Sequence, residues 1–301
     1  MNSPANTKTV RELIQVTSDY LADKAIESAR LSAERLLADV LGLSRIELYF
    51  QHDRPVLGQE LDRFRSLVRR RAGGEPLQTI LGQTEFYSRP FRVEPGVFIP
   101  RPETERLVET TADLLAPADR RLLAPMAVEI GCGTGIIGIS LALEIPRLTV
   151  HATDINPLAV DLARRNAHQL GVDARVEFHH GSRFDPLPAR LRGEVDLLVS
   201  NPPYIRQADI PGLVVEVVEH DPVEALDGGA DGLVFYRALA SHMNEWVRPG
   251  GHVAVEIGDD QGHEVTGILA ASGGLDLRII KDYADRDRVV VARLGDTTQE
   301  N

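Results

Sequence analysis

Hydrophobic residues recur every three or four positions through residues 9–72, with polar residues between them. This spacing is typical of amphipathic helices that bury one face. Gly42 can end the second helix, Ser44 can cap a short third one, and a fourth is expected from Leu57 to Arg71. The pattern predicts a helical N-terminal domain over residues 1–74. The apolar positions that carry the spacing are Val10, Leu13, Ile14, Leu21, Leu36, Leu37, Val40 and Leu41.

A run of turn-forming residues, Gly-Gly-Glu-Pro at 73–76, follows the last of these helices and predicts a linker. Beyond it, residues 78–81 and 85–93 have the composition of two short strands. We therefore assign residues 75–100 to a β-hairpin linker.

From residue 101 onward, short apolar runs alternate with segments of helical spacing, so the order predicts an α/β domain at 101–295. Its sheet is mainly parallel with helices on both faces, and residues 296–301 form a polar, flexible tail. Strands are expected at 127–130, 149–154, 175–180, 195–200 and 251–257, with a closing hairpin at 275–281 and 288–294. Helices are expected at 103–115, 135–144, 157–170, 232–247 and 261–272.

A glycine-rich turn lies between the first strand of this domain and its helix, where residues 129–135 read Glu-Ile-Gly-Cys-Gly-Thr-Gly. Backbone N–H groups in such a turn, together with a helix N-terminus, bind polar or anionic ligand groups. The next strand ends in Asp154, whose carboxylate can accept hydrogen bonds from both hydroxyls of a ribose. Residues 133–138 also fit G-x-G-x-x-G, so a dinucleotide remains an alternative. The additional Glu129 and Gly131 favour a nucleoside without a pyrophosphate.

The sequence Asn201-Pro202-Pro203-Tyr204 follows the strand at 195–200. An asparagine side chain both accepts and donates hydrogen bonds, and prolines leave rigid carbonyl acceptors beside it. Tyrosine adds a face on which a flat group can stack. Together these residues can hold a planar nitrogen, either a carboxamide or an exocyclic base amine. A proline turn that only ends the strand is the alternative.

The three features together resemble the class I S-adenosylmethionine-dependent methyltransferases. Residues 98–105, Phe-Ile-Pro-Arg-Pro-Glu-Thr-Glu, narrow the resemblance to the protein-(glutamine-N5) methyltransferases that act on peptide chain release factors, the HemK/PrmC family. Sister enzymes that modify a ribosomal-protein glutamine usually lack the second proline and Glu-Thr-Glu. The resemblance covers almost the whole chain and implies a Rossmann-like, seven-stranded domain after a small all-helical domain that docks the substrate.

The resemblance implies transfer of a methyl group from S-adenosyl-L-methionine to the amide nitrogen of the glutamine in the Gly-Gly-Gln loop of release factors. We expect the Asn201 side-chain oxygen and the Pro202 carbonyl to accept the two N–H bonds of that amide. Relatives often carry an acidic residue where Ser182 stands, and Arg183 can cover the adenine ring instead. The implied cofactor contacts are Gly131, Cys132, Gly133, Thr134, Gly135, Asp154, Arg183 and Asn201. The implied substrate contacts are Asn201, Pro202, Pro203 and Tyr204, of which Asn201, Pro202 and Tyr204 are assigned to catalysis.

Other activities remain open at this point. The acceptor can be a ribosomal-protein glutamine or an exocyclic amine of DNA or RNA, because each presents a planar nitrogen. An NAD-type dehydrogenase and a non-catalytic cofactor-binding module are the remaining alternatives.

The net charge of −12 and the pI near 5.2 argue against stable nucleic-acid binding, which usually needs a basic surface. We expect a monomer whose partner is a protein. The run Arg69-Arg70-Arg71 is typical of a solvated last helical turn, with contact to RNA or an acidic partner as the alternative. No membrane-spanning run or signal peptide is evident, so we expect a cytoplasmic protein.

Cys132 is the single cysteine, so no intrachain disulfide can form. We interpret it as a small residue in a turn that approaches a ligand, not as a nucleophile. We expect no metal site at His151, His179 and His180, because adjacent histidines on a strand point to opposite faces. No carboxylate or cysteine cluster completes such a site in the sequence.

The tetrapeptide Val-Glu-Ile-Gly occurs twice, at residues 128–131 and 255–258. The second copy lacks the glycines that follow the first. We interpret it as a sheet strand of similar composition, not as an internal repeat.

Overall fold

A computed structural model describes residues 8–116 and 124–295, which form parts of two compact units. Among the described residues, one unit contains residues 8–83 together with Val215–His220. The other contains residues 84–116, 124–214 and 221–295. The sequence placed boundaries after residues 74 and 100, whereas the first unit extends to Gln83 because Leu77 is buried in its helical core. The proposed tail, residues 296–301, lies outside the described residues.

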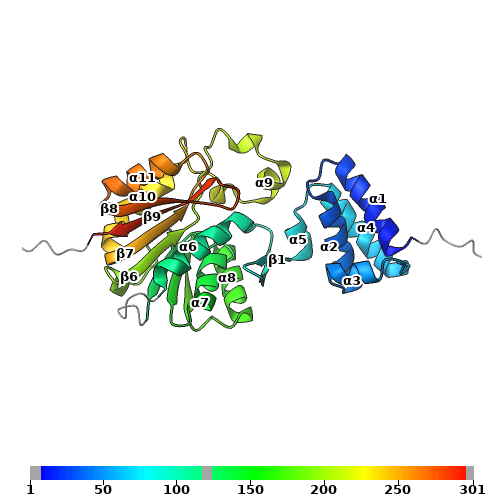
Figure 1. Ribbon diagram of the computed structural model, residues 1–301, viewed down its shortest axis with the longest axis horizontal. Helices are drawn as coiled ribbons and strands as arrows, with labels where there is room; N and C mark the ends of the chain where they lie inside the picture. The colour runs from blue at the N-terminus through cyan, green and yellow to red at the C-terminus, as the bar shows by residue number, and fades with distance from the viewer. Residues whose placement is uncertain (1–7, 117–123, 296–301) are drawn as a thin grey trace, which may run out of the picture. The chain divides into compact units, whose positions relative to one another are not determined.

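The first unit is built on helices at the positions that the apolar spacing predicted (Figure 1). The side chains of Thr9 and Ser44 form capping boxes at two helix N-termini, and Gly42 ends a helix in the left-handed conformation with φ +65°. The predicted roles of Gly42 and Ser44 are therefore confirmed. The helices are α1 (Val10–Asp23), α2 (Ala29–Leu41), α3 (Arg45–Phe50) and α4 (Gly58–Ala72).

The segment that follows α4 differs from the prediction. Residues 78–81 lie in a short helix, α5 (Leu77–Leu81), so the expected strand was wrong there. Pro76 precedes the helix and Gly82 ends it with φ +68°, and these local start and stop signals outweigh the strand-like composition. The hairpin lies directly afterwards, as β1 (Gln83–Phe86) and β2 (Arg89–Arg92).

Helix α9 (Val215–His220) had no counterpart in the sequence prediction, and it belongs to the first unit. Arg71 explains this assignment, since its Nη2 lies 2.6 Å from Glu216 Oε1 and its side chain is buried. The prediction that the arginine run is simply solvated was therefore wrong for Arg71, whose charge is paired within the unit.

The second unit contains a seven-stranded sheet with the order β5-β4-β3-β6-β7-β9-β8. The first five strands in this order are parallel, and β9 pairs antiparallel with both β7 and β8. All seven strands lie where the sequence predicted them, although β7 begins earlier. They are β3 (Met126–Ile130), β4 (Thr149–Asp154), β5 (Val176–His180), β6 (Val195–Ser200), β7 (Val247–Glu256), β8 (Gly274–Lys281) and β9 (Asp287–Leu294).

Helices cover both faces of this sheet, and each face has its own hydrophobic core (Figure 1). One face carries α6 (Glu105–Leu115), α7 (Ile136–Glu144) and α8 (Pro157–Gln169), and the other carries α10 (Val234–Trp246) and α11 (Gly262–Ala271). This arrangement confirms the predicted α/β, Rossmann-like class. Within the part of the chain that the structure describes, no helix combines the length and apolar character needed to cross a bilayer.

Candidate active site

The glycine turn and the Asn-Pro-Pro-Tyr segment leave the sheet side by side. Strands β3 and β6 are parallel neighbours, with Glu129 opposite Val199, and the Ser200 hydroxyl donates to the Ile130 carbonyl at 2.6 Å. The order of parallel strands reverses between β3 and β6, and open α/β sheets bind their ligands at such a point, beyond the carboxyl ends of the strands. The hydrogen bond joins residues 70 positions apart in the sequence, so the fold brings together two motifs that are distant along the chain.

The glycine turn leaves open space above its first two glycines. Gly131, Gly133 and Gly135 have backbone φ values of +79°, +53° and +81°, which residues other than glycine rarely adopt. A Cβ at Gly131 or Gly133 would meet no neighbouring atom of the described chain within 4 Å, whereas one at Gly135 would lie 2.9 Å from Ile139 Cδ1. The first two positions thus let a ligand approach the backbone, and the third lets α7 pack closely.

Asp154 lies beside this turn, as the prediction required. Its Oδ2 accepts from the Gly133 N–H at 2.8 Å and its Oδ1 from the Asn156 N–H at 2.9 Å. Burial raises the pKa of Asp154, while these N–H donors oppose the rise. The Gly181 N–H donates to the Asp154 carbonyl at 2.9 Å, so the loop that carries exposed Arg183 begins next to the carboxylate.

The glycine turn, the carboxylate and the loop at 181–183 therefore lie together at the carboxyl ends of β3, β4 and β5. The open approach at Gly131 and Gly133 and the carboxylate beside them fit S-adenosyl-L-methionine. Cys132 lies inside the turn with its side chain buried, and burial raises the pKa of its thiol. A thiol that stays protonated is a poor nucleophile, which supports the interpretation of Cys132 as a small packing residue.

The amide of Asn201 is oriented by a residue from the Arg-Pro-Glu-Thr-Glu segment. Its Nδ2 donates to the Thr104 hydroxyl at 3.1 Å, and Thr104 is buried. Because the nitrogen is engaged inside the protein, the Asn201 side-chain oxygen is the group available as an acceptor. Thr104 therefore links the segment at 98–105, which narrowed the family resemblance, to Asn201.

The backbone around Tyr204 is closely packed. A Cβ at Gly228 would lie 2.9 Å from the Tyr204 carbonyl carbon, and one at Gly232 would lie 2.5 Å from the Tyr204 oxygen. The Gln261 side-chain amide also donates to that oxygen at 3.0 Å. Burial raises the pKa of Tyr204 to about 12, so its phenol stays neutral near pH 7. These contacts make the segment after β6 a rigid platform.

Glu256, at the end of β7, contacts the candidate site residue Asn201, and the sequence analysis did not single it out. Burial raises its pKa to about 7, and the Thr104 hydroxyl, Arg288 and the Asn201 side chain oppose that rise. Its Oε2 is buried without a hydrogen-bond partner among residues 8–116 and 124–295. The available signal was the repeated Val-Glu-Ile-Gly, which places an acidic residue at the end of a second central strand.

The histidine prediction needs a correction. His179 and His180 do point away from each other, since His179 Nε2 lies 3.1 Å from His151 Nδ1 whereas His180 Nε2 lies 3.1 Å from the Ile155 carbonyl. The expectation that no carboxylate joins the histidines was wrong, however. Glu177 shares a face of β5 with His179, and the β4–β5 register places it opposite His151. Burial lowers the pKa of His151 and His179, so both rings are neutral near pH 7.

The chain matches two protein-family models and many known proteins. Residues 12–82 match the model of the PrmC N-terminal domain, and residues 90–245 match that of the Methyltransferase small domain. The release factor glutamine methyltransferase of Geobacter sulfurreducens is 43% identical over 95% of this chain and 97% of its own length. That of Moorella thermoacetica is 41% identical, over 94% and 98%.

The chain belongs to the release factor glutamine methyltransferase family. Family membership confirms the resemblance drawn from the motifs and identifies the protein as a methyltransferase, not a dehydrogenase. Among solved structures, the hMettl16 catalytic domain superposes with a TM-score of 0.54 at 13% identity, over 70% of this chain and 77% of that chain. This likeness shows the fold alone.

Proposed function

We propose that this protein methylates the side-chain amide nitrogen of the glutamine in the Gly-Gly-Gln loop of a peptide chain release factor, with S-adenosyl-L-methionine as the methyl donor. The names of its relatives support the substrate. The observation that carries the proposal is the contact of Asn201 Nδ2 with Thr104, because it orients an acceptor oxygen at the carboxyl end of β6.

The residues that would hold the cofactor are the turn at 131–135, Asp154 and the loop with Arg183. When bound, S-adenosyl-L-methionine supplies a methyl group attached to a positively charged sulfur. The sulfur leaves as a neutral thioether, so no general acid is required. Asp154 would accept hydrogen bonds from the ribose hydroxyls. Ser182 stands where relatives often carry an acidic residue, and Arg183 would cover the adenine ring.

The protein's main task is to position and activate a poor nucleophile, since the lone pair of an amide nitrogen is delocalised into its carbonyl. The Asn201 side-chain oxygen and the Pro202 carbonyl would accept the two N–H bonds of the substrate. These N–H groups become stronger donors as positive charge develops on nitrogen, so the acceptors bind the transition state more tightly than the ground state. Tyr204 and Pro203 would confine the amide plane on their closely packed backbone.

Glu256 acts as a positioning residue in this scheme, because it touches Asn201 and Thr104 and not the reacting atoms. In its ionised form it accepts hydrogen bonds from both side chains. Their donors are then directed inward, and the Asn201 oxygen is directed toward the substrate.

Mass spectrometry of a release factor incubated with the protein and S-adenosyl-L-methionine tests the proposal. We expect one added methyl group on the glutamine of the Gly-Gly-Gln loop, and no methylation of DNA or RNA in parallel reactions. Methyl transfer to nucleic acid, or to a different residue of the release factor, would contradict it.

We further propose that the first unit docks the release factor. The six-residue helix α3 exposes Ile46 and Phe50, 69% and 81% accessible, one helical turn apart on one side. Single exposed apolar residues are common, but an adjacent pair forms a patch, and exposed apolar patches mark protein interaction sites.

Phe50→Ser should raise KM for a whole release factor by about tenfold, which corresponds to ~1.4 kcal/mol of lost contact. It should leave KM for a short Gly-Gly-Gln peptide unchanged, because the peptide reaches only the second unit. Leu275→Ser, which removes a 48% exposed apolar residue from β8, is the matched control and should change neither value. Equal effects of Phe50→Ser on both substrates would argue against docking.

A further inference from the structure

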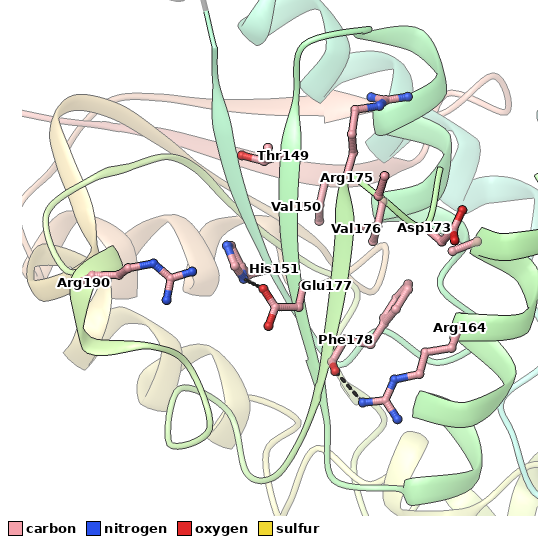
Figure 2. A pocket seen from close by; sticks show the side chains of 12 residues that line it. Thr149, Val150, His151, Arg164, Asp173, Arg175, Val176, Glu177, Phe178 and Arg190 are labelled. Atoms are coloured by element: carbon pink, nitrogen blue, oxygen red, sulfur yellow. Dashed lines mark hydrogen bonds and ion pairs between the residues drawn. The ribbon is translucent and has the colours of Figure 1, made fainter. Parts of the chain in front are cut away.

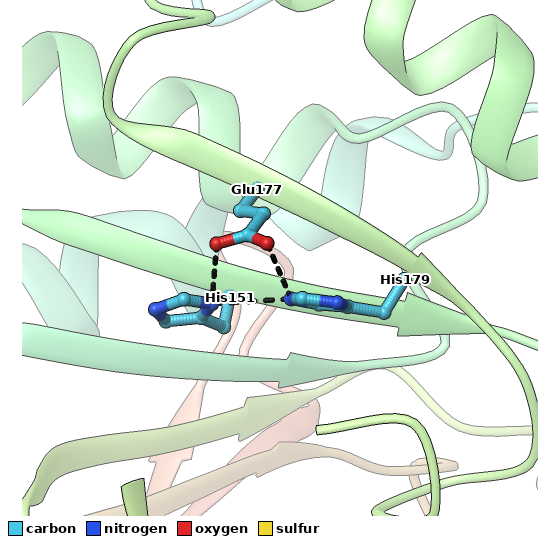
Figure 3. A group of neighbouring side chains, drawn as sticks. All are labelled: His151, Glu177 and His179. Atoms are coloured by element: carbon cyan, nitrogen blue, oxygen red, sulfur yellow. Dashed lines mark hydrogen bonds and ion pairs between the residues drawn. The ribbon is translucent and has the colours of Figure 1, made fainter. Parts of the chain in front are cut away.

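Three possible metal ligands converge at the edge of the sheet in the second unit. His151 projects from β4, and Glu177 and His179 project from β5, so that their polar atoms face one another (Figure 3). Within residues 8–116 and 124–295, this is the one group of at least three His, Cys, Asp or Glu side chains whose ligand atoms lie within 4.8 Å of each other.

The distances suit a single small cation. His151 Nδ1 lies 3.1 Å from His179 Nε2 and 3.4 Å from Glu177 Oε2, and His179 Nε2 lies 3.9 Å from Glu177 Oε1. Ligand atoms at ~2.0–2.1 Å from a tetrahedral zinc ion are about 3.3 Å from one another. One ion can therefore reach all three side chains after small rotations of exposed Glu177.

The strand register explains why these side chains meet. Glu177 and His179 are two residues apart on β5 and so lie on the same face, and parallel pairing places His151 opposite Glu177. The two imidazole rings are stacked, with centroids 5.4 Å apart and an angle of 23° between their planes. The same contacts would occur in a hydrogen-bonded cluster without a metal. A measurement of metal binding therefore distinguishes a metal site from such a cluster.

We propose that His151, Glu177 and His179 bind a divalent transition-metal ion, with zinc as the best match, and leave a fourth position for water. Two imidazoles and one carboxylate form a donor set that zinc prefers, whereas magnesium and calcium require mainly oxygen ligands. His151 and Glu177 also line a cavity of about 540 Å³ (Figure 2).

Arg190 lines the same cavity and places a positive charge on its wall (Figure 2). This charge repels a bound cation and so opposes binding, and deprotonation of the water in the fourth position would offset the repulsion.

A bound ion would join the edge strand β5 to β4 just before the cofactor loops. The Gly181 N–H already donates to the Asp154 carbonyl at 2.9 Å, two residues beyond His179. Zinc should therefore stabilise this edge of the sheet and raise the melting temperature. Methyl transfer from a sulfonium requires no metal, so we expect the ion to change the stability of the protein and not its turnover.

Isothermal titration of untagged, chelator-treated full-length protein with zinc chloride tests the site. Wild type should bind one zinc ion per chain, and Glu177→Gln should weaken binding at least tenfold, since even changes outside the ligand shell cost about 10–100-fold in metal affinity. Because the Glu177 side chain is 60% exposed, this substitution should not disturb folding. His179→Ala should weaken binding further.

The matched control is His168→Ala, which removes an exposed imidazole from α8 and should bind zinc like wild type. The melting temperature should rise with zinc in wild type and in His168→Ala but not in Glu177→Gln. Absence of zinc binding by wild type, or equal affinity in wild type and Glu177→Gln, would overturn the proposal.

Discussion

The two copies of Val-Glu-Ile-Gly lie at the ends of β3 and β7, the strands on either side of β6, yet their glutamates have different surroundings. Glu129, on β3, lies under the glycine turn and its Oε2 accepts from the Gly138 N–H at 2.9 Å. Glu256, on β7, lies among Thr104, Asn201 and Arg288. Both side chains are buried, and each has one carboxyl oxygen without a partner among the described residues.

Burial raises the pKa of Glu129 to about 8 and that of Glu256 to about 7. Glu129 is therefore protonated at neutral pH and joins a strand to a helix. Glu256 is near its midpoint at pH 7 and orients an amide. The comparison teaches that an identical tetrapeptide contacts a neighbouring helix in one place and the amide of Asn201 in another, according to which distant segments surround it.

Asn201→Ala removes the amide that Glu256 contacts, and it should have the largest effect of these substitutions. The substitution removes the proposed acceptor, so kcat should fall by about 10²–10³-fold, or ~2.7–4 kcal/mol, the usual loss for one transition-state hydrogen-bond partner. Affinity for S-adenosyl-L-methionine, measured by calorimetry, should stay within a few-fold. Asn244→Ala, which removes an amide from α10, is the control and should retain wild-type turnover. Wild-type turnover in Asn201→Ala would reject the assigned role.

The protonation of Glu129 predicts a pH-dependent stability. Its ordinary pKa of 4.5 rises to about 8 on folding, so the folded state holds a proton that the unfolded state releases. This contribution is complete below pH 4.5 and is lost as the pH rises through 8. Between pH 5.5 and 7.5 the free energy of unfolding should fall by up to about 2.7 kcal/mol from this group, roughly 1.36 per pH unit.

Glu129→Gln should remove that part of the slope in urea unfolding at the two pH values, because glutamine does not titrate and can still accept from the Gly138 N–H. Glu256→Gln should also reduce the fall of the unfolding free energy with pH, but only up to about pH 7, where Glu256 itself ionises. An unchanged slope in Glu129→Gln would show that Glu129 is ionised in the folded protein.

Gly138→Ala tests how closely α7 packs against Glu129 and Val150. A Cβ at this position would lie 2.7 Å from Glu129 Oε2 and 3.0 Å from Val150 Cγ1. Overpacking of this kind costs about 1–3 kcal/mol, which chemical denaturation can measure. Gly267→Ala in α11 is the matched control, since its Cβ would meet nothing within 4 Å and should be neutral or slightly stabilising. Similar results for both variants would contradict the packing role.

Glu256→Gln should have the smallest effect, a loss of about tenfold in kcat, or ~1.4 kcal/mol, with little change in KM. The ionised carboxylate is the better acceptor for Asn201 and Thr104, so wild-type kcat should rise with pH through about 7. The variant should lose this rise, whereas Glu129→Gln should keep it. A purely structural Glu256 would leave the pH profile unaltered.

The sequence by itself determined the alternation of strands and helices, the glycine turn with Asp154, and the position of Asn201–Tyr204 after a central strand. These features depend on periodicity and turn residues within short segments, and each is confirmed at its predicted place in the chain. The assigned roles of the site residues stay predictions.

Only the tertiary structure decided that Thr104 and Glu256 meet Asn201, that Glu177 joins His151 and His179, and that α9 belongs to the first unit. The contacts of Asn201 and of His151 depend on strand order and register, whereas that of α9 depends on the ion pair between Arg71 and Glu216. The spacing of residues along the chain contains no such information, because the order and register are fixed only when the two hydrophobic faces of the sheet are covered.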